Sequence, residues 1–155
     1  MASSIFIYSD GSCDIETKAG GWGCILKYGN VEKEFSGSAL KTTNQRMEMQ
    51  GAIEALSHIT RPVDIVAKSD SNYLIKGMRE WHHAWLTKNW FNSQGKPVVN
   101  RDLWEKLIEY NNKYKITWQW CPEDASEYIL RCHDLAITAM KKRRVQLKSG
   151  NKLEW

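Results

Sequence analysis

The first part of the chain alternates apolar and polar positions in a way that predicts strands. Residues 5–10 form a short apolar, β-branched run, and residues 22–28 and 31–35 alternate on either side of Gly29 and Asn30. β-Branched and aromatic residues favour half-buried strands, and a Gly-Asn pair favours a tight turn. We therefore expect the domain to begin with three antiparallel strands.

From residue 42 onward the apolar spacing changes to that of a helix. Thr42 and Gln45 have the spacing of an N-terminal capping box, and Pro62 marks the end of the segment. An apolar run over residues 63–68 predicts a fourth strand. Because a strand, helix and strand in succession join parallel neighbours through a right-handed crossover, the sheet should be mixed. The apolar positions of this helix, spaced i, i+3, i+4 and i+7, are Met49, Ala52, Ile53 and Leu56.

The second half of the chain predicts more helices and a fifth strand. Trp104, Trp118 and Trp120 are expected in the core, and Asn100 is a candidate helix N-cap. The fold class that follows is α/β (α+β), with a five-stranded mixed sheet flanked by helices. The predicted segments are a helix over 73–86 broken near Gly77, a loop over 89–100, a helix over 101–112, a strand over 116–120 and a helix over 127–143.

Composition narrows the class of protein. With 42% hydrophobic and 26% charged residues, the chain is an ordinary globule, expected as one domain over residues 1–144 and a tail over 145–155 without periodicity. No apolar run reaches the roughly 20 residues that a bilayer requires, and the start of the chain lacks a secretory pattern. We therefore expect a cytoplasmic monomer without membrane contact. The four cysteines include no C-x-x-C pair and are expected to be free thiols.

The charge of the chain is mildly basic. A net charge of +4 and a pI near 8.8 attract polyanions weakly. Four consecutive cations at residues 141–144 fall at the end of the last predicted helix, where the helix dipole favours positive charge. Charge alone therefore does not identify a nucleic-acid partner.

Three acids occupy positions at which a site would form. Asp10 and Asp70 each end a strand as Ser-Asp, and Glu48 lies in the second turn of the helix between these strands. Functional groups gather outside strand ends in open sheets, so the three carboxylates are expected to converge. Clustered carboxylates repel one another unless a cation lies between them, and oxygen ligands suit Mg²⁺ or Mn²⁺. Taken singly, each acid could instead form a turn or favour the helix dipole.

Five segments together resemble the type 1 ribonuclease H family of bacteria, in the same order and with the same separations. The resemblance implies the ribonuclease H-like fold and metal-binding roles for Asp10, Glu48 and Asp70. It also implies an endonuclease that hydrolyses the RNA strand of RNA–DNA hybrids with two metal ions, leaving 5′-phosphate and 3′-hydroxyl ends. The segments are YSDGSC at 8–13, TTNQRMEM at 42–49, KSDSNYLIKG at 68–77, KPVVNRDLW at 96–104 and ITWQW at 116–120.

The last helix departs from the family pattern. The family's fourth metal ligand is an Asp two residues before a Leu-Ala pair, a position that is His133 here, with Asp134 following it. One residue rotates a side chain by about 100° around a helix, so the two cannot simply exchange places. Either His133 gives a nitrogen to the second ion, or a locally rewound helix lets Asp134 coordinate, or neither residue binds metal. A nitrogen ligand is softer than a carboxylate, so a His site predicts a preference for Mn²⁺.

Two loops also differ from the family. Residues 122–127 replace a Gly-His-Ala-Gly-His-type segment, and Asp124 stands where the family has a His that assists catalysis or product release. This acidic loop predicts slower turnover, or else it caps the last helix through Ser126 or Asp124. After the first strand, Glu16 replaces an Asn that contacts RNA sugar in the family.

The resemblance further assigns substrate-binding residues. Asn44 and Gln45 would read 2′-hydroxyl groups of RNA, although both could be plain cap residues. Aromatic side chains of the family's basic protrusion would hold the DNA strand. The assigned residues are Cys13, Asn44, Gln45 and Asn72 beside the acids, Lys41, Thr43 and Asn100 in a DNA-phosphate pocket, and Trp81 and Trp85 in the protrusion.

Three functional hypotheses follow. The first is a metal-dependent ribonuclease H. The second is a catalytically impaired hybrid-binding module on the same fold, which the altered fourth ligand and loop would favour. The third is a nuclease region of a larger polyprotein, which is less expected for a chain that starts at Met1 and carries the protrusion.

Overall fold

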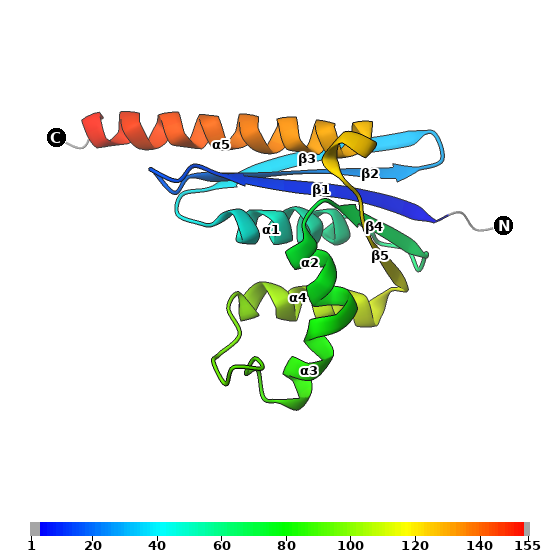
Figure 1. Cartoon of the computed structure of the whole chain (residues 1–155). Coiled ribbons are helices and arrows are strands. Elements are labelled where there is room, and N and C mark those ends of the chain that lie inside the picture. The colour runs from blue at the N-terminus through cyan, green and yellow to red at the C-terminus, as the bar shows by residue number, and fades with distance from the viewer. Residues whose placement is uncertain (1–3, 154–155) are drawn as a thin grey trace.

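The computed structural model describes the backbone of residues 4–153 and the side chains of residues 4–148. Its strands are β1 (Ile5–Cys13), β2 (Gly20–Tyr28), β3 (Val31–Ala39), β4 (Ile65–Ser69) and β5 (Ile116–Trp120). They form one sheet in the order β3-β2-β1-β4-β5 (Figure 1). The first three strands are antiparallel, whereas β4 is parallel to both of its neighbours. The predicted five-stranded mixed sheet is confirmed.

Helices cover both faces of the sheet. The helices are α1 (Asn44–Ser57), α2 (Asn72–Lys76), α3 (His82–Thr87), α4 (Arg101–Lys113) and α5 (Glu127–Leu153). α5 lies along one face against β1 and β2, and α1 packs on the opposite face with α4 beyond it (Figure 1). None of the helices within residues 4–153 is long and apolar enough to cross a membrane.

The core has two parts, one on each side of the sheet. The larger part lies between the sheet and α1 and α4 and contains Leu56, Ile65 and Trp104. The smaller part lies beneath α5 and contains Ile25 and Ile129. The sheet is therefore buried on both faces around its centre, which holds β1 and its acidic residue rigidly.

Two glycines let helix backbones approach the strands that carry the site. A Cβ atom on Gly23 of β2 would lie 2.6 Å from the carbonyl oxygen of Cys132 in α5. A Cβ atom on Gly11 of β1 would collide with the backbone of α1 at Met47 and Glu48. Because real Cβ atoms do not approach so closely, only glycine permits this packing, and both helices are drawn against the central strands.

Several local expectations need correction. The N-cap of α1 is Thr43 rather than Thr42, because the Thr43 hydroxyl accepts a hydrogen bond from the backbone N–H of Arg46. Asn100 precedes α4 as predicted, but its side chain makes no capping hydrogen bond. The helix break near Gly77 is confirmed as a π-helical segment, Gly77–Trp81, between α2 and α3.

The last helix is longer than the sequence predicts. α5 continues to Leu153, ten residues past the predicted end at residue 143. The division into a domain over residues 1–144 and a tail over 145–155 stays a prediction, although the helix is continuous through residue 144. The cations at residues 141–144 therefore do not lie at a helix terminus.

Candidate active site

The three predicted acids meet beside the centre of the sheet. Asp10 and Asp70 follow Ser9 and Ser69, which are paired neighbours in the parallel strands β1 and β4. Glu48 approaches from the second turn of α1. Each carboxylate offers one oxygen such that all three oxygens lie within 4.8 Å of one another.

The environment of the acids opposes their ionisation. Burial, followed by repulsion from Asp70, raises the pKa of Asp10 to about 7, and this residue is only 3% exposed. The Gly11 N–H donates a hydrogen bond of 2.9 Å to Asp10 and opposes part of this shift. Burial also raises the pKa of Glu48, against the effect of hydrogen bonds from Ser71 and Asn44. Without a cation, the cluster therefore holds protons that ordinary carboxyl groups would lose.

Asp70 contributes a second indication that the cluster suits a cation. Its Oδ1 atom is buried and has no hydrogen-bond partner within the described part of the chain. Buried carboxylate oxygens are normally satisfied, and three adjacent carboxylates normally need a counter-charge. A hard divalent cation would meet both requirements, so the donor set fits Mg²⁺ or Mn²⁺.

The structure brings His133, and not Asp134, to this cluster. The Nδ1 atom of His133 lies 3.0 Å from Oδ2 of Asp10, and its Nε2 atom lies 3.7 Å from Oε1 of Glu123. Asp134 is exposed and lines a shallow hollow on the other side of α5 with Glu34 and Arg131. The helix keeps its regular register, as the rotation of about 100° per residue requires.

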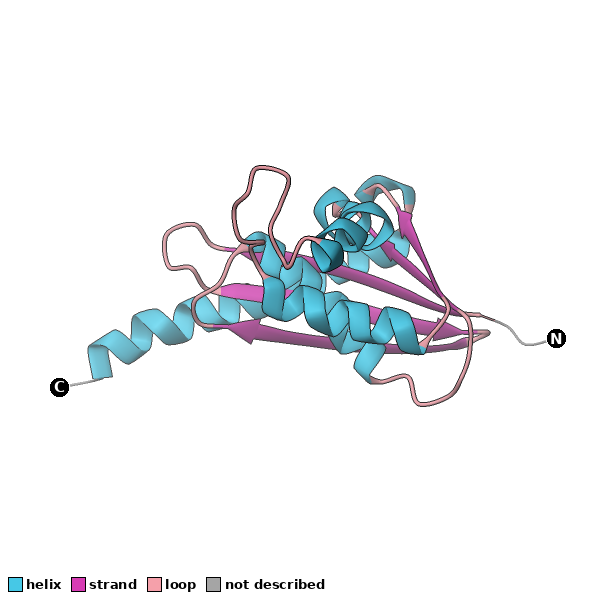
Figure 2. Ribbon diagram, turned by 90° about the horizontal axis from the view of Figure 1, so that it is seen from below, coloured by secondary structure: helices cyan, strands magenta, loops and turns pink. Residues whose placement is uncertain are grey.

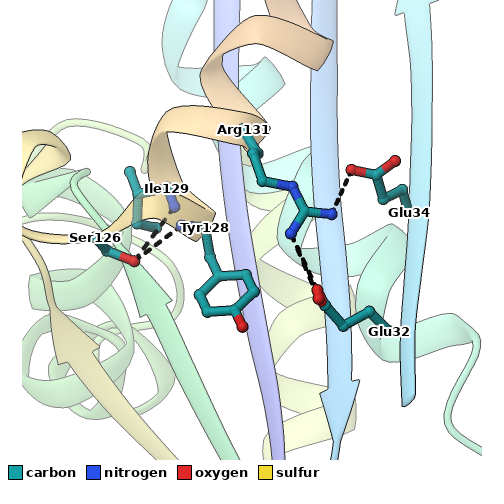
Figure 3. Close-up of polar contacts among 6 residues, drawn as sticks. All are labelled: Glu32, Glu34, Ser126, Tyr128, Ile129 and Arg131. Atoms are coloured by element: carbon teal, nitrogen blue, oxygen red, sulfur yellow. Dashed lines mark hydrogen bonds and ion pairs between the residues drawn. The ribbon is translucent and has the colours of Figure 1, made fainter. Parts of the chain in front are cut away.

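Polar contacts at the start of α5 hold this register (Figure 3). Arg131 bridges two acids of β3, with contacts of 3.0 Å to Glu32 and 2.8 Å to Glu34. The Ser126 hydroxyl accepts the backbone N–H of Tyr128 at 3.2 Å and so caps the helix. Arg131 and His133 therefore extend to opposite sides of the helix, one toward the sheet edge and the other toward Asp10.

Two residues beside the acids and His133 were not predicted to belong to the site. Glu123 approaches His133, whereas its neighbour Asp124 is exposed in a short 3-10 turn and does not cap α5. Trp120, expected in the core, is 48% exposed, and its indole N–H donates a 3.0 Å hydrogen bond to the carbonyl oxygen of Asp70. The one available signal was position, because Trp120 pairs with Ser69 at the end of β4.

Most of the predicted substrate residues lie on the N-terminal side of α1. Asn44 donates a 3.1 Å hydrogen bond to Glu48, and Gln45 is exposed beside it. The Cys13 thiol contacts the carbonyl oxygen of Thr42 at 3.4 Å, which places the end of β1 against the start of α1.

Two of the three residues assigned to a phosphate pocket, Thr43 and Asn100, contact Arg46, which the sequence analysis did not single out. The Arg46 backbone binds Thr43, and its guanidinium contacts Asn100 at 3.2 Å and Asp102 at 2.7 Å. Lys41 and Arg46 both line a surface hollow, and neither Thr43 nor Asn100 is among its lining residues.

The two tryptophans of the protrusion differ in exposure. Trp81 is 38% exposed, whereas Trp85 is 9% exposed and packs against Trp104 with ring centroids 5.2 Å apart. Both rings line one surface hollow with Lys88. Asn72 is exposed at the first position of α2, two residues after Asp70.

Comparison with known proteins agrees with this geometry. A sequence model of the RNase H family matches residues 2–147. A ribonuclease H of Geotalea uraniireducens is 45% identical over 141 residues, covering 87% of this chain and 92% of that protein. A ribonuclease H of Pelobacter propionicus is 44% identical over 143 residues, covering 92% and 88% respectively.

Solved structures give the same result. LC9-RNase H1, described as a type 1 RNase H with the type 2 active-site motif, is 26% identical and superposes with a TM-score of 0.81, covering 92% of this chain and 74% of that one. LC11-RNase H1, solved in complex with an RNA/DNA hybrid, shares the fold at 17% identity with a TM-score of 0.69, covering 90% of this chain and 98% of that one. The chain belongs to the type 1 ribonuclease H family.

Proposed function

We propose that this chain is a divalent-metal-dependent endonuclease that hydrolyses the RNA strand of RNA–DNA hybrids and leaves 5′-phosphate and 3′-hydroxyl ends. The observation that carries the proposal is the convergence of Asp10, Glu48 and Asp70, with ligand oxygens within 4.8 Å. The relatives named ribonuclease H support the reaction class. We further propose that it acts as a cytoplasmic monomer.

In the proposed site the acids hold two metal ions. Bound Mg²⁺ or Mn²⁺ ions would supply an activated water and stabilise the leaving oxygen of the phosphodiester. Asp10, Glu48 and Asp70 would hold the ions, and the surrounding donors keep the carboxylates in place. The Gly11 N–H orients Asp10, and the Asn44 amide orients Glu48. The indole of Trp120 fixes the backbone at Asp70.

His133 is proposed as the fourth ligand. Its Nδ1 atom already lies at the cluster, whereas Asp134 lies on another face of α5. Because imidazole is a softer ligand than carboxylate, we propose that the enzyme prefers Mn²⁺ to Mg²⁺.

The hybrid is proposed to lie across the N-terminal side of α1. Asn44, Gln45 and the backbone at Cys13 would contact 2′-hydroxyl groups, with Asn72 on the far side of the acids. Lys41, Thr43 and Asn100, with Arg46 between them, would bind a phosphate of the DNA strand. Exposed Trp81 would contact the DNA strand, and buried Trp85 would support it from below.

A cleavage assay tests the proposal. An RNA–DNA hybrid labelled at the RNA 5′ end is incubated with Mg²⁺ or Mn²⁺, and the product ends are identified. We expect internal cleavage of the RNA strand only, faster with Mn²⁺, and its loss in Asp10→Asn. Cleavage of both strands, or full activity of Asp10→Asn, would contradict the proposal.

A binding module without cleavage is the second candidate. Its specific support is the loop before α5, where Asp124 is exposed and no His is present. The same assay distinguishes the two, since a binding module would retain the hybrid in a gel shift and cleave it with neither metal.

A further inference from the structure

The last helix extends beyond the sheet that it covers. In both ribbon views the C-terminal part of α5 continues past the ends of the strands that it covers (Figure 1, Figure 2). This part carries cations at residues 141–144 and at Lys148. Because α5 ends at Leu153, residues 141–144 lie outside the last turn, where a helix dipole favours cations. The dipole therefore does not account for them.

Three of these cations share the side of α5 that faces the active site. At about 100° per residue, Arg144, Lys148 and Lys141 lie about 20°, 60° and 80° around the helix from His133, all in the same direction. Arg143 lies about 80° in the opposite direction, and its guanidinium donates a 3.0 Å hydrogen bond to Ser38 of β3. Lys142 lies about 180° away and lines the hollow beside Arg131 on the β3 side.

A contact fixes where this side of the helix lies. The guanidinium of Arg144 is 3.4 Å from Oδ1 of Asp14, the residue that follows β1 and its Asp10. Lys141 and Lys148 are exposed, and neither has an ion-pair partner within residues 4–148. Lys141 and Lys148 therefore present unpaired charges to solvent along the part of α5 that leads away from His133.

We propose that Arg144, Lys148 and Lys141 form a cationic track that binds the sugar–phosphate backbone of the hybrid on one side of the cleaved bond. At 1.5 Å per residue, Arg144 and Lys148 lie about 17 and 23 Å along the helix from His133. With one phosphate per 3.4 Å of strand, the track reaches about five to seven base pairs from the cleaved bond. This inference rests on the proposed function and adds a contact surface outside its site.

The test compares two double variants with equal loss of charge. Lys141→Gln/Lys148→Gln removes two cations of the track. Lys142→Gln/Lys115→Gln removes two exposed lysines elsewhere. Each hybrid has a short central RNA tract, and the flank on one side of this tract is either about three or about twelve base pairs long. The two sides are varied in separate hybrids. Only the long flank can reach the track. Binding is measured by fluorescence anisotropy in EDTA, and KM and kcat by cleavage.

We expect the wild-type protein to bind more tightly when the long flank is on the side of the track than when that flank is short. The KM should fall correspondingly, and kcat should not change. The track variant should lose this advantage, and the control variant and Lys141→Arg/Lys148→Arg should retain it. On the long flank the salt slope should fall by about 1.8, so that wild type loses about 12-fold more affinity than the track variant between 50 and 200 mM salt.

Equal behaviour of the two double variants, or no effect of flank length in wild type, would overturn the cationic track. If wild type binds with the expected flank dependence but cleaves no hybrid, the track stands and the proposed catalytic function fails. Unchanged melting temperatures exclude unfolding as the cause.

Discussion

Replacing Asp10 by Asn should make the metal-free protein more stable at neutral pH while it abolishes catalysis. Asp10 is buried beside Asp70, and its pKa is raised to about 7 from an ordinary value of 3.8. Between these values the folded protein holds a proton that the unfolded chain has released. The contribution of Asp10 to the free energy of unfolding is therefore highest below pH 4, falls as the pH rises toward 7, and stays low above it.

The size of the effect follows from this shift. A difference of about three pKa units corresponds to about 4 kcal/mol, which is an upper limit because Asp70 and His133 respond to the same charge. Asn cannot ionise, but it also loses the charged contact with His133. We expect a net gain of about 2 kcal/mol at pH 8, or a rise in Tm of about 4–8 °C for a domain of this size.

Urea unfolding in EDTA at pH 5 and pH 8 measures the prediction. The gain of Asp10→Asn should be large at pH 8, small at pH 5, and reduced by saturating Mn²⁺, which binds and stabilises only the wild-type cluster. The control is Asp64→Asn, which makes the same chemical change at an exposed position before β4 and should show no such pH dependence. A lower stability of Asp10→Asn at pH 8, or a difference independent of pH, would refute the electrostatic argument.

Three further predictions use other contacts. His133→Asp should raise the ratio of Mg²⁺ to Mn²⁺ activity several-fold, because a carboxylate replaces the softer nitrogen; an unchanged ratio in steady-state assays would remove His133 from the ligand set. Trp81→Ala should raise KM for hybrids about 5- to 50-fold with little change in kcat, as expected for loss of one stacking contact, and a fall in kcat alone would contradict a binding role. Gly23→Ala should cost about 1–3 kcal/mol in urea unfolding, because its Cβ meets Cys132 of α5, and a neutral result would show that α5 can shift.

The sequence contained enough information to place the three acids and to predict which residue of the last helix, His133, faces them. Asp10 and Asp70 both follow apolar strands, and parallel pairing of those strands brings them together. The buried positions Cys132 and Ala136 fixed the rotation of α5, which placed His133 rather than Asp134 toward the acids. Because apolar residues recur along the buried face of a helix, its orientation can be predicted without knowing which element it packs against.

Structural features that lack a repeated apolar pattern could not be predicted from the sequence. Beyond the sheet α5 has no surface to bury, so Val145 is exposed and no apolar period marks the helix. Trp120 alternates with Trp118 as a core residue would, but it is the last residue of an edge strand, where the covering helices end. Arg46 contacts Asn100 and Asp102, and Glu123 approaches His133, in each case across the fold. Such isolated long-range contacts leave no repeated pattern in the sequence around either residue.

A histidine at position 133, in place of a fourth carboxylate, affects both the stability of the metal-free protein and its attraction for metal ions. Each carboxylate added to a buried acidic cluster repels its neighbours when the site is metal-free, yet strengthens the attraction for a cation. His133 instead donates or accepts at Asp10, 3.0 Å away, and adds no negative charge. The cluster is therefore easier to fold without metal than one with four carboxylates, and it attracts Mg²⁺ less strongly. The proposed cationic track along α5 fits this arrangement, because contacts with the sugar–phosphate backbone outside the site would help to hold the hybrid where the attraction for metal ions is lower than that of four carboxylates.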